Sequence, residues 1–153
     1  MAATTANLIA QGTLTTLLST ELNSLASGSY SSVGSAFNNV FATANFNGYF
    51  LADVMLNLAA YTGTPTAGAF FEVWFIPAID GSVYDTSGST ISVGPNAIIP
   101  VDALASGPYQ RTVSNIWVPC GQFKTLAQSN GMGIALAASG NTIKIRPVSL
   151  QSQ

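Results

Sequence analysis

The sequence predicts an all-β domain, an antiparallel β-sandwich or jelly-roll-like fold of about seven or eight strands. Three observations predict this fold. From about Tyr49 onward, short runs rich in β-branched and aromatic residues are separated by Gly, Pro, Asn and Asp. These turn residues recur about every 8 to 15 positions, as expected for two packed antiparallel sheets. The 153 residues are 48% hydrophobic, which suffices for one sizeable core and leaves little for a second.

Two runs in the middle of the chain predict the central strands. In residues 49–60 the polar Asp53 and Asn57 alternate with apolar residues at even positions, namely Phe50, Ala52, Val54, Leu56 and Leu58. This period of two predicts a half-buried strand. Residues 69–76 are apolar on both faces apart from Glu72. They predict a central strand, or one whose outer face meets a partner.

The second half of the chain predicts further strands. Residues 90–93 and 110–118 are expected to be extended, and three prolines between them limit how much of that stretch can join a sheet: Pro95, Pro100 and Pro108. Residues 122–128 lead into Asn130-Gly131, a dipeptide that favours tight hairpins, so residues 132–138 are expected to be the returning strand. In the last strand the side chains alternate, with Ile143 and Ile145 on one face and Lys144 and Arg146 on the other.

The first third of the chain fits more than one local structure. Its leucines fall at helical spacing and favour a short helix, whereas the intervening Thr and Ser residues favour an extended arm; the leucines are Leu14, Leu17, Leu18, Leu22 and Leu25. Residues 28–39 fit a strand followed by a loop, or an edge hairpin. We therefore divide a single domain into residues 1–45, an N-terminal arm with the first strands, and residues 46–153, the sandwich core.

The charge composition excludes several classes of partner. Only ten residues are charged, six acidic and four basic, or 7% where about 25% is usual. A net charge of −2 offers no polybasic surface for phosphates, so nucleic acid is not an expected partner. No run approaches the roughly 18 apolar residues of a membrane-spanning helix. The N-terminus lacks the basic and apolar regions of a secretory signal, which predicts synthesis in a cytoplasm.

The reactive side chains form no convincing catalytic or metal-binding pattern. The sequence has no histidine, so no common zinc site and no base for a serine nucleophile are available, and a Ser–Lys pair with Lys124 or Lys144 has nothing to mark it. The lone Cys120 forms no internal disulfide and fits a small turn residue. Gly131 and Gly133 lack the remaining features of a phosphate loop. We predict no enzyme activity, no cofactor and no metal.

Acidic and aromatic residues leave three weaker alternatives open. Glu72, Asp80 and Asp85 are the candidates for paired glycosidase carboxylates, and the loop 80–89 for calcium, but its spacing matches no EF-hand, so structural roles are favoured. Trp74 and Trp117 would suit a sugar-stacking platform, although large strand aromatics more often belong to a core or an interface. The core is predicted to contain Val54, Leu56, Leu58, Phe71, Val73, Phe75, Trp117, Phe123, Ile143 and Ile145.

A surface so poor in charge is suited to permanent contacts. It must be covered largely by Ser, Thr, Asn, Gln, Gly and Ala, whose burial costs little ion desolvation and little side-chain entropy. Obligate interfaces are likewise depleted in charge at their centres. The composition therefore predicts a homo-oligomer or a component of a lattice.

Four segments resemble a known group of proteins: residues 21–28 (ELNSLASG), 49–58 (YFLADVMLNL), 72–84 (EVWFIPAIDGSVY) and 129–147 (SNGMGIALAASGNTIKIRP). They are similar to the capsid decoration or cement proteins of tailed bacteriophages. The resemblance implies a β-sandwich that binds the outside of the capsid shell and stabilises it. It also implies the major capsid protein and copies of the chain itself as partners, often in a trimer, and a place in the virion after assembly in the bacterial cytoplasm.

Two other functions remain open at this point. The sequence also fits a tail, fibre or baseplate component, and a carbohydrate-binding sandwich used for host recognition. If the first forty or so residues form an arm that orders on a neighbour, deletion of residues 1–20 should weaken particle binding without unfolding the sandwich.

Overall fold

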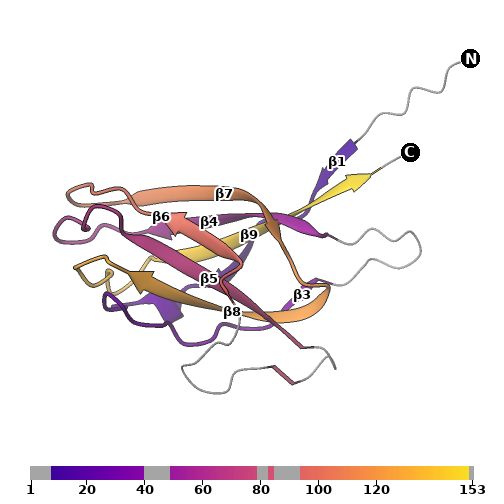
Figure 1. The fold of residues 1–153 in the computed structure, drawn as a ribbon, viewed down its shortest axis with the longest axis horizontal. Coiled ribbons are helices and arrows are strands. Elements are labelled where there is room, and N and C mark those ends of the chain that lie inside the picture. Colours follow the sequence, from indigo (N-terminus) through magenta and orange to yellow (C-terminus); the bar gives the residue numbers. More distant parts are fainter. Residues whose placement is uncertain (1–7, 40–48, 79–82, 85–93, 152–153) are drawn as a thin grey trace, which may run out of the picture.

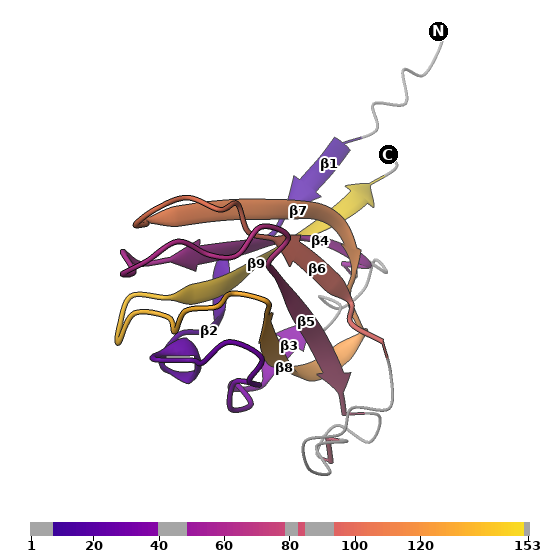
Figure 2. The same ribbon diagram turned by 60° about the vertical axis from the view of Figure 1, so that its left-hand side comes forward.

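Two antiparallel sheets packed face to face make up the computed structural model, which describes residues 8–39, 49–78, 83–84 and 94–151 (Figures 1 and 2). These ranges contain nine strands and one turn of 3-10 helix, η1 (Thr20–Leu22), so the predicted β-sandwich is confirmed. The five-stranded sheet has the order β1–β9–β4–β7, with β2 also paired to β9; it contains β1 (Leu8–Gln11), β2 (Thr15–Leu18), β4 (Leu51–Leu58), β7 (Tyr109–Trp117) and β9 (Thr142–Gln151). The four-stranded sheet has the order β3–β8–β5–β6; it contains β3 (Phe37–Asn39), β5 (Phe70–Pro77), β6 (Ala97–Pro100) and β8 (Gly121–Asn130).

The core lies between the sheets and follows the alternation that the sequence predicts. On β4 the even side chains from Ala52 to Leu58 are buried and the odd ones are partly exposed. The other sheet contributes Phe71, Val73 and Phe75 of β5 and the fully buried Phe123 of β8. All predicted core residues except Trp117 are buried; they are Val54, Leu56, Leu58, Phe71, Val73, Phe75, Phe123, Ile143 and Ile145.

The outer face of β5 carries a second, smaller apolar cluster. Trp74 and Ile76 lie there with Leu126 of β8, all buried, and Tyr84 packs against them. The ring of Tyr30 lies 5.7 Å from that of Trp74. The chain therefore covers part of this apolar face itself, which explains why β5 is apolar on both sides.

The N-terminal segment belongs to the sandwich over its described length. β1 and β2 both pair with β9, and Leu17, Leu18 and Leu22 are buried in the main core. The leucine spacing produces a strand followed by a single 3-10 turn, so the short helix exists only as η1. Figures 1 and 2 show β1 and the end of β9 projecting together from the body as a two-stranded ribbon.

Residues 28–39 run along one edge of β8. Tyr30 forms a bridge with Gln128, and β3 continues the antiparallel pairing near the other end of β8. Between them Gly34 donates its N–H to the Thr125 carbonyl and passes very close to β2. A Cβ at Gly34 would lie 2.5 Å from the Leu17 carbonyl oxygen, so this crossing requires glycine.

The prediction of a hairpin at Asn130-Gly131 is wrong. β8 ends at Asn130, and residues 131–141 form no strand; they connect β8 to β9 in the other sheet. Met132 and Leu136 are buried within this connection. Its backbone instead forms hydrogen bonds with residues near η1: the N–H of Leu136 donates to the Leu25 carbonyl. The connection thus covers one end of the core with its buried side chains.

Other expectations fall partly outside the described residues. The strand expected at residues 90–93 lies outside them. Within the proline-punctuated stretch, β6 pairs with the edge of β5 and ends at Pro100, as a proline at a sheet edge allows.

Trp117 lies on the outside of the sandwich, contrary to the core prediction. Its side chain is 70% exposed. The β4–β7 register shifts between Ala52 and Val54, opposite Asn115, whose φ is +61°. This extra residue is a β-bulge, and it reverses the side-chain parity of β7. Tyr109 and Val113 therefore face the core before the bulge, whereas Ile116 and Val118 do so after it.

Candidate functional site

The outward side chains of β9, β4 and β7 form a surface that we call the β9–β4–β7 face. The strand register arranges them in rows, the first being Val148, Leu51 and Trp117. The second row contains Arg146 and Asp53. The remaining rows are neutral apart from Lys144, and their neutral members are Met55, Thr112, Thr142, Asn57 and Gln110.

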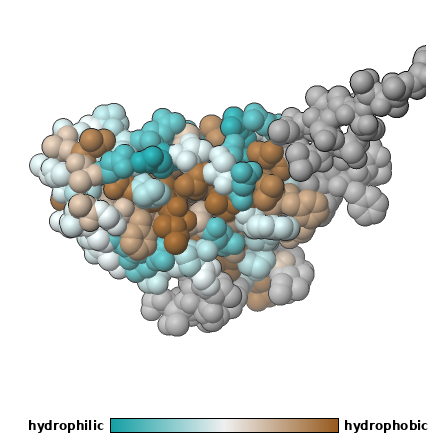
Figure 3. Space-filling view, turned by 45° about the horizontal axis from the view of Figure 1, so that its top comes forward, coloured by the Kyte–Doolittle hydropathy of each residue, from teal (hydrophilic) through white to brown (hydrophobic). Residues whose placement is uncertain are grey.

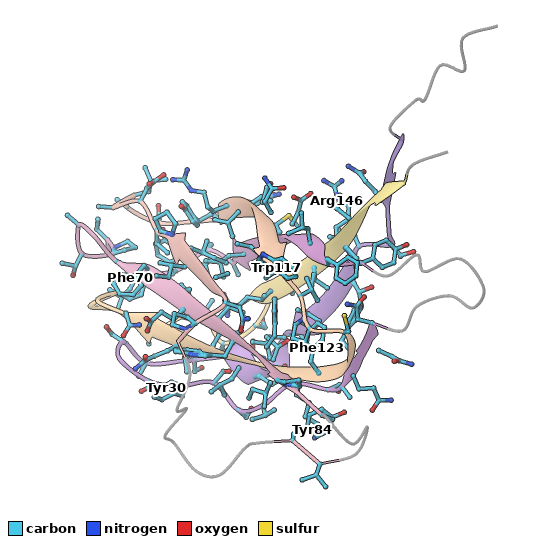
Figure 4. All side chains as sticks on the ribbon, turned by 45° about the vertical axis from the view of Figure 1, so that its right-hand side comes forward. Tyr30, Phe70, Tyr84, Trp117, Phe123 and Arg146 are labelled. Carbon is cyan, nitrogen blue, oxygen red and sulfur yellow. The ribbon has the colours of Figure 1, made fainter. Side chains whose placement is uncertain are left out.

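Aromatic side chains gather at one end of this face. Trp117 lies beside Phe50, which is 45% exposed, with ring centroids 6.3 Å apart in an edge-on arrangement. Leu51 and Val148 extend the apolar row across the neighbouring strands. Figure 4 shows Trp117 and Arg146 on one side of the molecule and Tyr30 and Tyr84 on the other, with Phe123 between them. The exposed tryptophan is available for a contact outside the domain.

An ion pair lies next to the aromatic row. Arg146 Nη2 donates to Asp53 Oδ2 at 2.7 Å, across the β4–β9 pair. The hydrogen bond from Arg146 lowers the pKa of the Asp53 carboxyl, against the opposing effect of burial. Asp53 is therefore ionised at neutral pH and neutralises Arg146.

Lys144 lies near the centre of the face. Its register partners are Thr16 of β2 and Met55 of β4, both uncharged. Successive outward residues of one strand lie about 7 Å apart, so Arg146 is its nearest charged neighbour along β9. Within the part of the chain that the structure describes, Lys144 makes no ion pair or side-chain hydrogen bond. Asp53, Lys144 and Arg146 together give the face one surplus positive charge.

The other charged side chains are occupied within the chain. Asp80 and Asp85 lie outside the described residues, which leaves eight of the ten. Glu21 accepts a hydrogen bond from the N–H of Ser19, and Glu72 accepts one from Asn130 Nδ2. Lys124 Nζ lies 4.5 Å from the centre of the Tyr84 ring. With the two ion pairs, seven of these eight have a partner, and the exception is Lys144.

A second polar cluster holds the loop after β6. Arg111 binds both carboxylate oxygens of Asp102 and donates from Nε to the Tyr109 hydroxyl, which raises the pKa of Arg111. The Tyr109 hydroxyl in turn donates to the Pro100 carbonyl. Tyr61 donates to the Leu104 carbonyl, and burial raises the pKa of Tyr61. These contacts fasten the loop to the sheet, so the cluster is structural.

The structure separates the candidate residues of the sequence. Trp74 is buried and Trp117 exposed, and they lie on different sheets, so they form no joint platform. Glu72 lies on the outer face of β5, while Asp80 and Asp85 fall outside the described residues, as does most of the loop 80–89. Cys120 is exposed in the turn between β7 and β8.

Lys124 and Lys144, the lysines considered for a Ser–Lys pair that nothing in the sequence marks, lie on opposite sheets. Among the described residues, no three metal-ligating side chains come together, and no helix is long and apolar enough to cross a membrane. The sequence alone did not predict the β9–β4–β7 face, because the bulge at Asn115 determines which way the Trp117 side chain points. The alternation of Lys144 and Arg146 with buried isoleucines was the visible signal.

The chain matches no family model, no curated protein and no solved structure.

Proposed function

We propose that this chain is a virion structural protein that binds the outer surface of a capsid shell and stabilises it, in the manner of a decoration or cement protein. The supporting observation is that the described part of the chain has few charged groups and leaves almost none of them unpaired. Seven of the eight described charged groups are occupied within the chain, and the large apolar side chain of Trp117 is 70% exposed. Figure 3 shows apolar residues in brown interspersed with pale and teal ones on one side of the molecule.

Such a surface favours permanent contact with the major capsid protein and with other copies of this chain. Burying it desolvates few ions and immobilises mainly short side chains. A protein that binds the assembled shell, and not its separate subunits, stabilises the assembled state by its binding free energy. At a free concentration 100 times the dissociation constant this amounts to about 2.7 kcal/mol per site, repeated over every site of the lattice.

The test is the composition of purified virions of the phage that encodes the chain. Quantitative mass spectrometry should find the protein at a copy number comparable with that of the major capsid protein. Virions that lack it should lose their genomes at lower temperature, and adding the purified protein back should restore them. A copy number typical of tail parts would place it in a tail, fibre or baseplate instead, and its absence from virions would refute the proposal.

A second candidate function is carbohydrate binding, which the exposure of Trp117 beside Phe50 favours. A sugar ring can stack on an exposed indole. Glycan-array binding that disappears with Trp117→Ala would support this function. Trp74→Phe serves as the control, because Trp74 is buried on the other sheet.

A further inference from the structure

We propose that the β9–β4–β7 face is the surface that docks on the shell, and that a carboxylate of the shell protein neutralises Lys144 there. This inference rests on the proposed function and adds to it the face and the chemistry of the contact. It is carried by three observations on the described residues: the unpartnered Lys144, the surplus charge of the face, and the exposed Trp117.

The first step concerns Lys144. Every other charged side chain among the eight described ones has a partner in its own chain. The side chains across from Lys144, Thr16 and Met55, carry no charge. An ammonium group that becomes buried without a partner is costly, whereas a carboxylate opposite it offsets that cost. A partner that covers this face must therefore bring an acidic group to Lys144.

The second step excludes the simplest alternative occupant. A twofold contact between two copies would place this face against itself. Each copy would present Lys144 and Arg146 with only Asp53 to compensate, so two surplus positive charges would meet. Like charges brought together at an interface oppose binding. The charge of the face thus favours a different, acidic surface over a symmetric second copy.

The third step concerns the anchor. Trp117 is 70% exposed and is flanked by Phe50, Leu51 and Val148. Exposed tryptophans in apolar surroundings become hot spots when a partner covers them. Excluding water around Trp117 also lowers the local dielectric constant, and this strengthens the attraction between Lys144 and a carboxylate two rows away. The aromatic and the charged parts of the face support each other.

The experiment measures binding of the purified full-length chain to shells that lack it. Lys144→Glu should weaken binding by about 30-fold or more, as does truncation of one partner of a desolvated charge pair. Trp117→Ala should weaken it by a similar factor. The matched controls are Lys124→Glu and Ile98→Ala, which change a lysine and an exposed apolar residue of the other sheet. Both should bind like the unaltered chain, and thermal unfolding should show that all four variants fold.

A zero-length carbodiimide cross-link tests the charge pair directly. On decorated shells it should join Nζ of Lys144 to an Asp or Glu of the shell protein, and mass spectrometry should identify the linked peptides. Cross-links that join Lys144 only to other copies of this chain would overturn the inference.

The outcomes separate the two proposals. If the unaltered chain does not bind shells, the proposed function fails. If it binds but Lys144→Glu and Trp117→Ala bind equally well, or if Lys124→Glu weakens binding as much, the docking face is wrong while the proposed function stands. If the two face variants instead abolish self-association and leave shell binding intact, the face is an interface between copies.

Discussion

Phe123 joins the aromatic rings at the centre of the sandwich. It is fully buried, and its ring lies 4.9 Å from that of Phe75 and 5.2 Å from that of Phe37. Because Phe37, Phe75 and Phe123 lie on β3, β5 and β8, this one side chain links three strands of the four-stranded sheet. Its packing is therefore difficult to replace.

Phe123→Ala is expected to lower the free energy of unfolding by about 3 to 5 kcal/mol, because it removes buried apolar area and leaves a cavity. Urea unfolding followed by circular dichroism measures the change. Leu104→Ala, at a position 52% exposed, is the control and should cost far less. Equal losses in both variants would contradict this account of the core.

Asn115 determines which side chains of β7 face outward. Its φ of +61° lies in the left-handed region, where asparagine is tolerated and β-branched residues are not. Because the bulge reverses the parity of the strand, this one backbone conformation places Trp117 in solvent.

Asn115→Val should destabilise the fold by about 1 to 2 kcal/mol, whereas Asn115→Gly should be nearly neutral. If the valine variant relieves its strain by losing the bulge, Trp117 turns inward and the tryptophan fluorescence shifts to shorter wavelength. Thermal unfolding together with emission spectra checks both effects. A valine variant as stable as the glycine one, with unchanged emission, would show that the bulge needs no left-handed residue.

At the scale of elements, the five-stranded sheet depends on its N-terminal strands. β2 pairs with β9 and contributes Leu17 and Leu18 to the core, both at most 5% exposed. Without β1 and β2, β9 would become an edge strand with unpaired backbone groups. The N-terminal strands therefore stabilise the domain itself. Deleting them is expected to destabilise the fold, whereas deleting an arm would only weaken particle binding.

Deletion of residues 1–18 is expected to unfold the domain or to reduce its stability by several kcal/mol, since each lost leucine alone is worth about 2 to 5 kcal/mol. Deletion of residues 1–7 leaves both strands intact and serves as the control. Chemical denaturation of the two truncated chains checks the difference. A chain without residues 1–18 that folds as stably as the control would show that β1 and β2 are dispensable.

At the scale of the whole molecule, the small number of ionisable groups limits the response to pH. The sequence has no histidine, so no side chain with an ordinary pKa near 6.5 is present. The hydrogen bond from Arg146 lowers the pKa of Asp53 from its ordinary value of 3.8. A lowered pKa in the folded state stabilises the fold above the unfolded value, and this contribution is lost as pH falls through the folded pKa.

Stability should thus be nearly constant between about pH 5 and pH 8 and should fall below pH 3.8, the ordinary value for Asp53. Asp53→Asn should lower the stability of the fold at pH 7 and make its further loss at acid pH smaller. Asp102→Asn is the matched control, because the Asp102 side chain is 56% exposed and that of Asp53 only 16%. Melting temperatures measured from below pH 3.8 up to neutral pH test this prediction. If Asp53→Asn loses as much stability at acid pH as the unaltered chain does, other carboxyl groups cause the loss.

Side-chain periodicity was sufficient for much of the fold. The alternation in residues 49–60 and at Ile143 and Ile145 identified strands and their buried faces, since a side chain in a strand can face only one of two ways. The doubly apolar run at residues 69–76 likewise predicted a strand covered on both sides, and Tyr30 and Tyr84 supply part of that cover. Composition also indicated a surface with few charges.

Contacts between distant segments decided the rest. The Asn130-Gly131 dipeptide has the local chemistry of a hairpin, but residues 131–141 cap the core because Leu136 bonds to Leu25. The N-terminal leucines became strand and turn because β9 offered an edge to pair with. The position of Trp117 depended on the bulge opposite β4, a feature of register between two strands that neither strand's own alternation encodes.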